Sequence, residues 1–489
     1  MSRVPALDID LLRTFVLIAD GASFTRAAQR IGRTQSAVTL QVQRLESLVG
    51  HRLFERSRGG AARLTPRGEL LLEQARTMTA LNDDIVLRLR DDRGVAASGQ
   101  SLPSHAKPVA MVERFANLGG NPADDYFVSG VSSAIADGLS HFGWLLVIQS
   151  DGTLPRRDPT GSGSGYLLRG QVRRAARHLR VGAELLDASG TLIWADRYDG
   201  RMDDTFELED RIIEAIAAAI EPKLRQAEIT RARRRRSASL DAYDLYLRAL
   251  PHTYAHMPQG TEFAIPLLER ALELDPDYAA AHALAAWCYE WRYTRGGFDE
   301  ANRGRSLFHA GAALALDSDD AGALAIAGFV TSLLSDERQR GLYAMKRAVA
   351  LSPSSTTVLY LASHAHAIGG EIEFARSAAD RALRLSPLDP LAFEANLALG
   401  DIAMLDERFA DAAACFGRAA AINPGYSTAR FFRAMALARD GRADAAAPFV
   451  RQGLDLEPGF NSRIVHEVGM APEMAARFLA GATALGLPT

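Results

Sequence analysis

Apolar and polar residues follow three different patterns along the 489 residues of the chain. Near the amino terminus, and again from about residue 240 to the end, apolar residues recur at the three- and four-residue spacing of helices. Between these parts, from about residue 107 to 225, short runs rich in apolar residues are separated by turn residues, which is typical of strands. A chain of this length exceeds a single hydrophobic core, so we expect a mainly α multidomain protein with one small α/β domain.

Three short helices are predicted before residue 50. The run LLRTFVLIADGASF is a helix that ends near Gly21, and Ser23 then caps a second helix, FTRAAQRIG, which Gly32 terminates. A third helix follows from Thr34. Its apolar residues at positions 38, 42, 45 and 49 point to one side, so they pack against the first two helices.

The opposite side of this third helix is polar. A short helix, a tight turn and a helix with hydrogen-bonding side chains near its amino end form the arrangement that lies in the major groove of DNA. Glutamine pairs with adenine through two hydrogen bonds, threonine contacts a base edge or a phosphate, and an apolar side chain meets a thymine methyl group. The residues of this helix that we expect to face DNA are Thr34, Gln35, Ser36, Thr39, Leu40 and Gln43.

A β-hairpin of the kind called a wing is predicted next, from two short apolar segments around Gly59 and Gly60 in HRLFERSRGGAARLTPRG. Cationic side chains bind phosphate groups, so the wing should add affinity that depends on salt and not on base sequence. Its expected phosphate contacts are Arg52, Arg56, Arg58 and Arg63. Thr65 and Pro66 then begin another helix, because proline lacks an N–H group and fits the first turn.

Residues 8–90 resemble the DNA-binding domain of LysR-type transcription regulators. The motifs F-x-x-x-A-x-x-x-S-F-T-x-A-A, Q-S-A-V-x-x-Q-V-x-R-L-E, L-F-E-R and L-T-x-x-G occur in the order typical of that family. The resemblance implies a winged helix-turn-helix over residues 1–65 that binds double-stranded DNA. Many relatives carry arginine where this chain has Leu40, so the chain departs from the family at this position. The residues that the resemblance places on DNA are Gln35, Ser36, Thr39, Arg56 and Arg58.

A heptad pattern follows in the helix from Thr65 to about Leu89, within a predicted linker and dimerisation helix at residues 66–92. The residues spaced alternately by four and three positions are Leu71, Ala75, Met78, Asn82, Ile85 and Leu89. A lone Asn in such a seam fixes the register of a two-stranded coil, and the LysR resemblance also implies a dimer. We therefore expect a homodimer through residues 66–90. The alternative is an amphipathic helix that packs on its own domain.

The pattern of residues 107–228 predicts that this segment forms the small α/β domain. The segments F-x-N-L-x-x-x-P-x-x-x-Y-F, L-x-G-x-V-R-R and W-A-x-R-Y-D resemble the TolB-amino-terminal-like module, which precedes tetratricopeptide repeats in certain bacterial adenylate cyclases and regulators. The arginine-rich run at 231–236 is interpreted as a solvated helix end, with binding to nucleic acid or anionic lipid as the alternative. The expected strands are 109–112, 144–148, 166–173, 179–186 and 192–197, with helices at 125–141 and around 212–224.

Residues 240–489 repeat themselves. Phrases such as ALELDPDYAAAHAL and AAAINPGYSTARFF recur six times, and successive phrases are 42, 35, 34, 37 and 34 residues apart. These spacings cluster on the ~34-residue period of the tetratricopeptide repeat, which is a pair of helices; an unrelated alanine-rich bundle is the alternative. Stacked repeats form a concave surface, so we expect a protein or peptide partner there. The corresponding positions are Pro276, Ser318, Pro353, Pro387, Pro424 and Pro458.

Charge and cysteine content limit the classes of protein to which the chain can belong. A net charge of -3 argues against coating nucleic acid along the whole chain, yet the first 75 residues hold 11 arginines against 7 acidic residues. Cys288 and Cys415 are far apart, which fits a reducing compartment and gives no zinc motif. No signal-peptide pattern or long apolar run occurs, so we expect a cytoplasmic protein without membrane contact.

No enzyme, cofactor or metal site is expected. The glycines at 161, 163 and 165 precede a strand, whereas a dinucleotide loop precedes a helix. The pairs His252 with His256 and His364 with His366 lack a third metal ligand. A signalling enzyme is disfavoured because no segment remains for a cyclase or kinase domain.

The predicted function is that of a bacterial DNA-binding transcription regulator with a LysR-type head and a tetratricopeptide-repeat region that senses a partner. The alternative is a protein-interaction scaffold whose winged helix no longer reads DNA. In such a scaffold we expect the face around Gln35 and Thr39 to be apolar, whereas in this chain that face is largely polar.

Overall fold

The computed structural model divides into two compact units, Met1–Ser101 and Leu102–Thr489. The mainly α architecture with one small sheet is confirmed. No helix within the described residues is both long and apolar enough to cross a membrane. The structure describes residues 9–19, 34–54, 64–68, 71–72, 75, 107–121, 124–150, 165–175, 178–201, 205–235, 240–254, 258–316, 319–387 and 389–488.

The first unit contains helices α1 (Ile9–Ala19) and α3 (Gln35–Val49). Their apolar sides meet in one core, in which Phe15 of α1 lies 5.3 Å from Phe54 between ring centres. Phe54 and Leu64 form an antiparallel bridge, as the base of the predicted wing requires. The expected second helix at 24–32 lies outside the described residues.

Both ends of α3 have recognisable caps. The backbone N–H of Ala37 donates to the Thr34 hydroxyl at 3.3 Å, which supplies one of the acceptors that a helix start lacks. Gly50 ends the helix with φ +74°, a conformation that favours glycine. The predicted start of the third helix at Thr34 is therefore confirmed.

The second unit begins with a sheet that contains the strands β3-β1-β4-β5-β6 in this order, with β2 also paired to β4. The pairs β1 with β3 and β1 with β4 are parallel, whereas β4, β5 and β6 form an antiparallel meander. The bounds are β1 Val109–Glu113, β2 Ala116–Asn117, α5 Asp125–Ser140, β3 Leu146–Ser150, β4 Gly165–Ala175, β5 His178–Asp187, β6 Leu192–Arg201 and α6 Thr205–Arg234.

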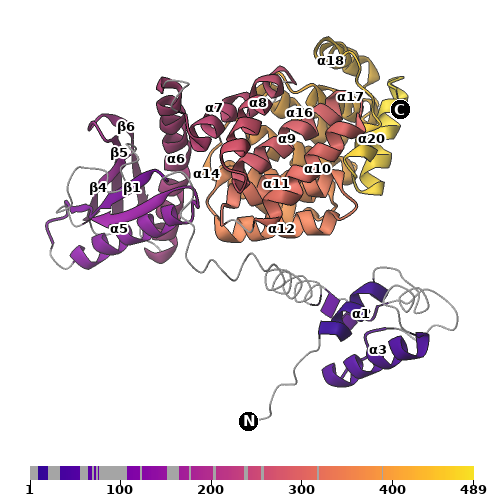
Figure 1. The fold of residues 1–489 in the computed structure, drawn as a ribbon, viewed down its shortest axis with the longest axis horizontal. Coiled ribbons are helices and arrows are strands. Elements are labelled where there is room, and N and C mark those ends of the chain that lie inside the picture. The colour runs from indigo at the N-terminus through magenta and orange to yellow at the C-terminus, as the bar shows by residue number, and fades with distance from the viewer. Residues whose placement is uncertain are drawn as a thin grey trace. The chain divides into compact units, whose positions relative to one another are not determined.

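One face of this sheet is covered by α5 and α6, which share a single apolar core with the strands (Figure 1). Buried and exposed residues alternate along β5, as expected for a sheet with one solvent face. On the solvent face, Arg169 and Glu184 pair across β4 and β5 at 2.7 Å. The expected strand at 144–148 begins two residues later, because Trp144 lies in the preceding turn with its ring 4.5 Å from the Arg225 guanidinium.

The remaining helices form hairpins. In five hairpins the second helix ends two residues before the proline of the repeated phrase. The second helix before Ser318 ends three residues before that serine, so the repeat pattern is confirmed. The bounds are α7 Ala242–Tyr254, α8 Pro258–Leu274, α9 Ala279–Arg295, α10 Glu300–Ala315, α11 Ala321–Leu334, α12 Arg338–Leu351, α13 Thr356–Ile368, α14 Ile372–Leu385, α15 Ala392–Leu405, α16 Phe409–Ile422, α17 Ser427–Arg439, α18 Ala443–Leu456, α19 Ile464–Glu467 and α20 Pro472–Ala484.

The hairpins form two layers of different character. The first helices of successive hairpins, α9, α11, α13 and α15, are buried along almost their whole length. The second helices, α10, α12, α14, α16 and α18, bury only one narrow face. Helix α20 packs against α15 and α17, so the chain beyond the last hairpin returns to the inner layer (Figure 1).

Candidate functional site

The outer side of α3 is the candidate nucleic-acid interface. Val38, Val42 and Leu45 are buried in the core of the unit, so the opposite side of the same helix faces away from that core. On that side Leu40 is 66% exposed and Gln43 is exposed. This division is what a recognition helix requires, because its core face holds the helix in place and its outer face reads the groove.

The sequence-predicted residues of α3 occupy this interface to different degrees. Thr34 is exposed at the amino end of the helix, and Thr39 is half-buried one turn further on. Gln35 and Ser36 form the first turn of α3, but their side chains lie outside the described residues.

A network of hydrogen bonds joins α3 to the wing. The Glu46 carboxylate accepts the backbone N–H groups of Leu53 at 2.8 Å and Phe54 at 3.4 Å, so the end of α3 determines where the wing starts. The Thr65 hydroxyl donates to the Arg52 carbonyl at 2.7 Å. Arg52 is exposed at this base, whereas Arg56, Arg58 and Arg63 lie outside the described residues.

The same contacts explain the L-T-x-x-G motif. Thr65 caps the following helix, because its hydroxyl accepts the backbone N–H of Gly68 at 3.1 Å. A Cβ atom at Gly68 would lie 2.2 Å from the Leu53 carbonyl oxygen, so only glycine fits where the helix crosses the strand.

The predicted dimerisation seam is described only at its first two positions. Ala75 is fully buried in the core of the first unit, and Leu71 packs against that core. These two residues therefore serve the fold of their own unit. Met78, Asn82, Ile85 and Leu89 lie outside the described residues.

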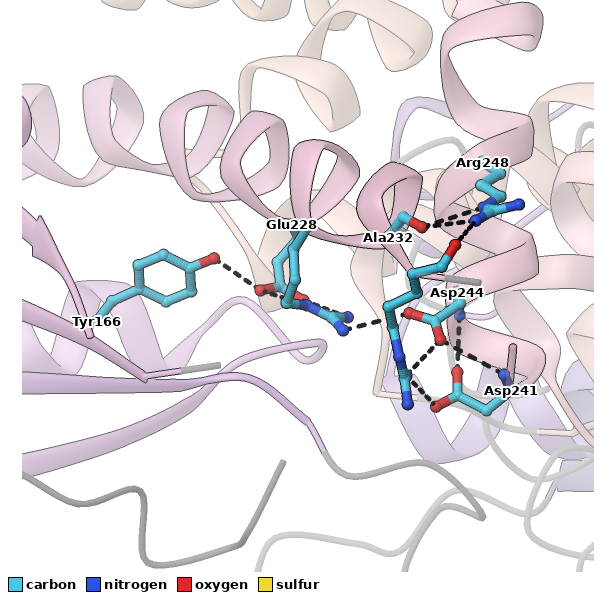
Figure 2. Close-up of polar contacts among 8 residues, drawn as sticks. Tyr166, Glu228, Ala232, Asp241, Asp244 and Arg248 are labelled. Atoms are coloured by element: carbon cyan, nitrogen blue, oxygen red, sulfur yellow. Dashed lines mark hydrogen bonds and ion pairs between the residues drawn. The ribbon is translucent and has the colours of Figure 1, made fainter. Parts of the chain in front are cut away.

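A second cluster of polar residues joins α6 to α7 (Figure 2). The Tyr166 hydroxyl donates to the Glu228 carboxylate at 2.7 Å, and Arg231 lies between Glu228 at 3.0 Å and Asp244 at 3.3 Å. Arg235 pairs with Asp244 as well. We call the cluster of Tyr166, Glu228, Arg231, Arg235, Asp241, Asp244 and Arg248 the polar joint, since it links the sheet to the first repeat.

In the polar joint, buried carboxylates pair with guanidinium groups, and each offsets the charge of the other. Glu228 and Asp244 are fully buried, and burial raises the pKa of the Asp244 carboxyl even though Arg231 and Arg235 act against it. Burial, together with the neighbouring Glu228, also raises the pKa of Tyr166. Arg248 donates to the Ala232 carbonyl at 2.9 Å and so holds the end of α6.

The polar joint refines the interpretation of the arginine-rich run as a solvated helix end. Arg231 is half-buried and pairs with Asp244 of α7, and the exposed Arg235 pairs with the same carboxylate. Arg233 and Arg234 remain exposed at the end of α6. Sequence reasoning missed the joint, since the partners of the run come from a helix that no pattern pairs with it.

Of the histidine pairs considered for metal binding, His364 and His366 have protein partners, whereas His256 lies outside the described residues. His364 Nδ1 lies 2.6 Å from the Glu394 carboxylate, and His366 Nδ1 lies 2.8 Å from the Ala362 carbonyl. Within the part of the chain that the structure describes, no three His, Cys, Asp or Glu side chains are grouped to hold a metal ion.

Comparison with known proteins identifies the first unit. Residues 9–69 match the family described as bacterial regulatory helix-turn-helix protein, lysR family. The resemblance seen in the motifs of this segment is thereby confirmed. The matched range contains α1, α3 and the Phe54 to Leu64 bridge.

Two curated relatives match different lengths of the chain. The putative adenylate cyclase 3 of Rhizobium meliloti (strain 1021) is 34% identical over 206 residues, which are 40% of this chain and 35% of that protein. The HTH-type transcriptional regulator DgdR of Burkholderia cepacia is 45% identical over 84 residues, 17% of this chain and 28% of that protein. The chain thus spans about a third of the first relative and less than a third of the second. The first alignment is longer than the first unit, so it extends beyond Ser101.

Among solved structures, the human IFIT1 dimer with m7Gppp-AAAA matches 59% of this chain and 71% of that chain. The sequence identity is 15% and the TM-score is 0.38.

Proposed function

We propose that the chain is a DNA-binding transcription regulator whose winged helix-turn-helix reads double-stranded DNA. The observation that carries this proposal is the division of α3 into a buried apolar side and an outer side with Thr34, Leu40 and Gln43. Arg52, which is exposed at the wing base, adds a cation that can contact phosphate.

The relatives support the same proposal. The family matched by residues 9–69 is regulatory and is named for its helix-turn-helix, and DgdR carries the name of a transcriptional regulator. One relative is named as a cyclase, but the match covers only 35% of that protein. We therefore propose a regulator that is not an enzyme and that acts in the cytoplasm, where it meets DNA.

The second unit serves, in this proposal, as the sensor region. The repeats present buried inner helices around a cavity, and the polar joint fastens them to the α/β domain at residues 107–228. A partner or ligand bound by the repeats can therefore act on the whole second unit. The regulator forms a homodimer through residues 66–90, which gives two recognition helices for two half-sites.

The test is genome-wide binding followed by gel shifts on the recovered sites at two salt concentrations. Gln35→Ala should relax sequence preference by roughly 1 to 3 kcal/mol. Combined Arg56→Ala and Arg58→Ala should weaken binding to all DNA and make the salt dependence shallower. Arg233→Ala, an exposed arginine of α6, is the matched control and should leave DNA binding unchanged.

A scaffold role is the second candidate, and Leu40 is the observation that favours it. An exposed apolar side chain at the centre of the outer face fits a protein contact as well as a thymine methyl group. If the wild-type chain shows no site preference and all variants behave like it, the scaffold replaces the regulator as the proposed function.

A further inference from the structure

A cavity lies on the inner side of the repeats. It is lined by α9, α11, α13, α15 and α17 and by the segment that begins at α19. The centres of water-sized molecules can occupy about 50 Å³ inside it, so it has room for a small ligand. Its aromatic walls come from Trp287, Trp291, Phe329, Tyr426 and Phe432.

The chain beyond the last hairpin closes one side of this cavity. The Tyr293 hydroxyl donates to the Glu467 carboxylate, and the backbone N–H of Ala471 donates to the Ile368 carbonyl at 2.8 Å. The returning segment thus occupies part of the concave side that an extended peptide would use. The residues that it contributes to the cavity wall are Ile464, Val468 and Met470. The remaining space suits a compact ligand.

Acidic side chains outnumber basic ones among the described residues around the cavity. Glu394 and Asp401 share one imidazole, because His364 Nδ1 lies 2.6 Å from Glu394 and Nε2 lies 3.5 Å from Asp401. Asp401 is fully buried, and neither of its oxygens has a hydrogen-bond partner among the described residues. Glu290 is 6% exposed and lines the cavity. Among the described residues, only the Thr294 hydroxyl donates a hydrogen bond to the Glu290 carboxylate, at 3.2 Å.

Arg295, which lies on the cavity wall, already has a counter-charge. Arg295 lies between the rings of Trp291 and Tyr426, with its guanidinium carbon 4.5 Å from each ring centre. Its Nη1 lies 3.7 Å from the Glu457 carboxylate and donates to the hydroxyls of Ser427 and Thr428 at 3.3 Å, while Nε has no acceptor among the described residues. An anionic ligand would have to compete with Glu457 for this cation.

We infer that the cavity binds a small organic cation, an amine or guanidine whose charge pairs with Glu290 and whose apolar body packs on the aromatic rings. Aromatic faces and a carboxylate together favour such a cation. A metal ion is disfavoured because no suitable group of three ligands occurs among the described residues. The inference deepens the proposed function, on which it rests for the role of the repeats, yet binding can be measured without DNA.

The pKa of Glu290 is consistent with this assignment. Burial raises it to about 7, although Arg295, the Thr294 hydroxyl and His364 act in the opposite direction. A carboxyl that burial makes costly to ionise becomes easier to ionise when a cation binds beside it.

The test uses the full chain in phosphate buffer at pH 8, with thermal melting and calorimetry. The amine probes are phenethylamine, tyramine, agmatine and putrescine, and 3-phenylpropanoate is the anionic counterpart of the first. At least one amine should raise Tm by a few degrees at ten times its Kd, whereas 3-phenylpropanoate should not. Glu290→Gln should weaken that amine at least about tenfold. Glu262→Gln, at an exposed carboxylate of α8, should leave its affinity unchanged.

Three results would overturn the inference. The first is that no amine binds wild type, or that 3-phenylpropanoate binds as well as the amines. The second is equal binding to wild type and Glu290→Gln. The third is stabilisation by a lysine-rich decapeptide and by none of the free amines, which would make an extended peptide the occupant. Gel shifts on the same samples report DNA binding separately, so failure of one proposal leaves the other measurable.

Discussion

Leu40 is an apolar residue where the outer face of α3 is otherwise polar. Its 66% exposure means that it contributes little to the core, so a substitution at this position tests binding more than folding. Val38, two residues earlier, is fully buried. The two positions therefore separate binding from folding within a single helix.

We predict that Leu40→Ala weakens specific DNA binding several-fold and changes the free energy of unfolding by no more than about 0.5 kcal/mol. The control Val38→Ala should lower Tm, because it removes buried methyl groups and leaves a cavity. Gel shifts and thermal melting on the same preparations check both statements. A large loss of stability in Leu40→Ala would contradict the placement of this residue on an outer face.

Glu290 should make stability depend on pH. Burial raises its folded pKa to about 7 from 4.5, so its favourable contribution is present below about pH 4.5 and is lost as pH rises through about 7. Burial likewise raises the pKa of Asp401 to about 7. Burial lowers the pKa of His364, but Glu394 and Asp401 outweigh it and raise that pKa, which gives the same direction.

We predict that Glu290→Gln and wild type have similar stability at pH 5 and that the variant becomes more stable by about 1 to 3 kcal/mol at pH 8. The reason is that the amide needs no ionisation in a buried place. Urea unfolding at both pH values measures the difference, with Glu262→Gln as an exposed control. A difference that does not grow with pH would mean that Glu290 ionises without cost.

At the scale of elements, α6 connects the two parts of the second unit. Its first half packs on the sheet, and its last turns carry Glu228, Arg231 and Arg235 into the polar joint with α7. Arg381 of α14 also pairs with Glu214 of α6, so the helix is held at both ends of its contact with the repeats.

We predict that Arg231→Met costs roughly 3 to 5 kcal/mol, because it leaves the fully buried Glu228 without its cation and removes one partner of Asp244. Arg233→Met, at an exposed position of the same helix, should change stability by no more than about 0.5 kcal/mol. Combining Glu228→Gln with Arg231→Met should recover part of the loss. Denaturant unfolding measures all three, and equal effects at 231 and 233 would contradict the joint.

At the scale of the whole molecule, the proposed DNA-binding part and the proposed sensor part belong to different compact units. The first unit, Met1–Ser101, has its own core around Leu12, Phe15 and Leu45. The second unit has separate cores in the sheet and in the repeats. The stability of the second unit and the binding of DNA should therefore respond to substitutions in different units.

We predict that a chain of residues 102–489 keeps the melting transition of the second unit within about 2 °C and loses specific DNA binding altogether. Full-length protein should bind its site with an affinity that falls steeply with salt, since about 0.9 counterions are released per phosphate contact. Melting curves and gel shifts at two salt concentrations check these outcomes. Retention of site-specific binding by residues 102–489 would move the DNA contact away from α3.

Local chemistry made much of this molecule predictable from its sequence. Helix ends follow from prolines that cannot continue a helix, from Gly50 with its positive φ and from the Thr34 cap, all of which act within a few residues. The recognition helix and the LysR motifs could be read because each spans one short element. The repeat period could be read because each hairpin contacts mainly its neighbours.

Tertiary structure decided the rest, because it brings together residues that no spacing relates. The sequence predicts a solvated Arg231, whereas the structure has Asp244 of α7 beside it. Tyr293 meets Glu467 across 174 positions of sequence, which closes the cavity on one side. The charge balance around Glu290 depends on side chains from several repeats, and only the packed structure places them in one low-dielectric space where unpaired charge is costly.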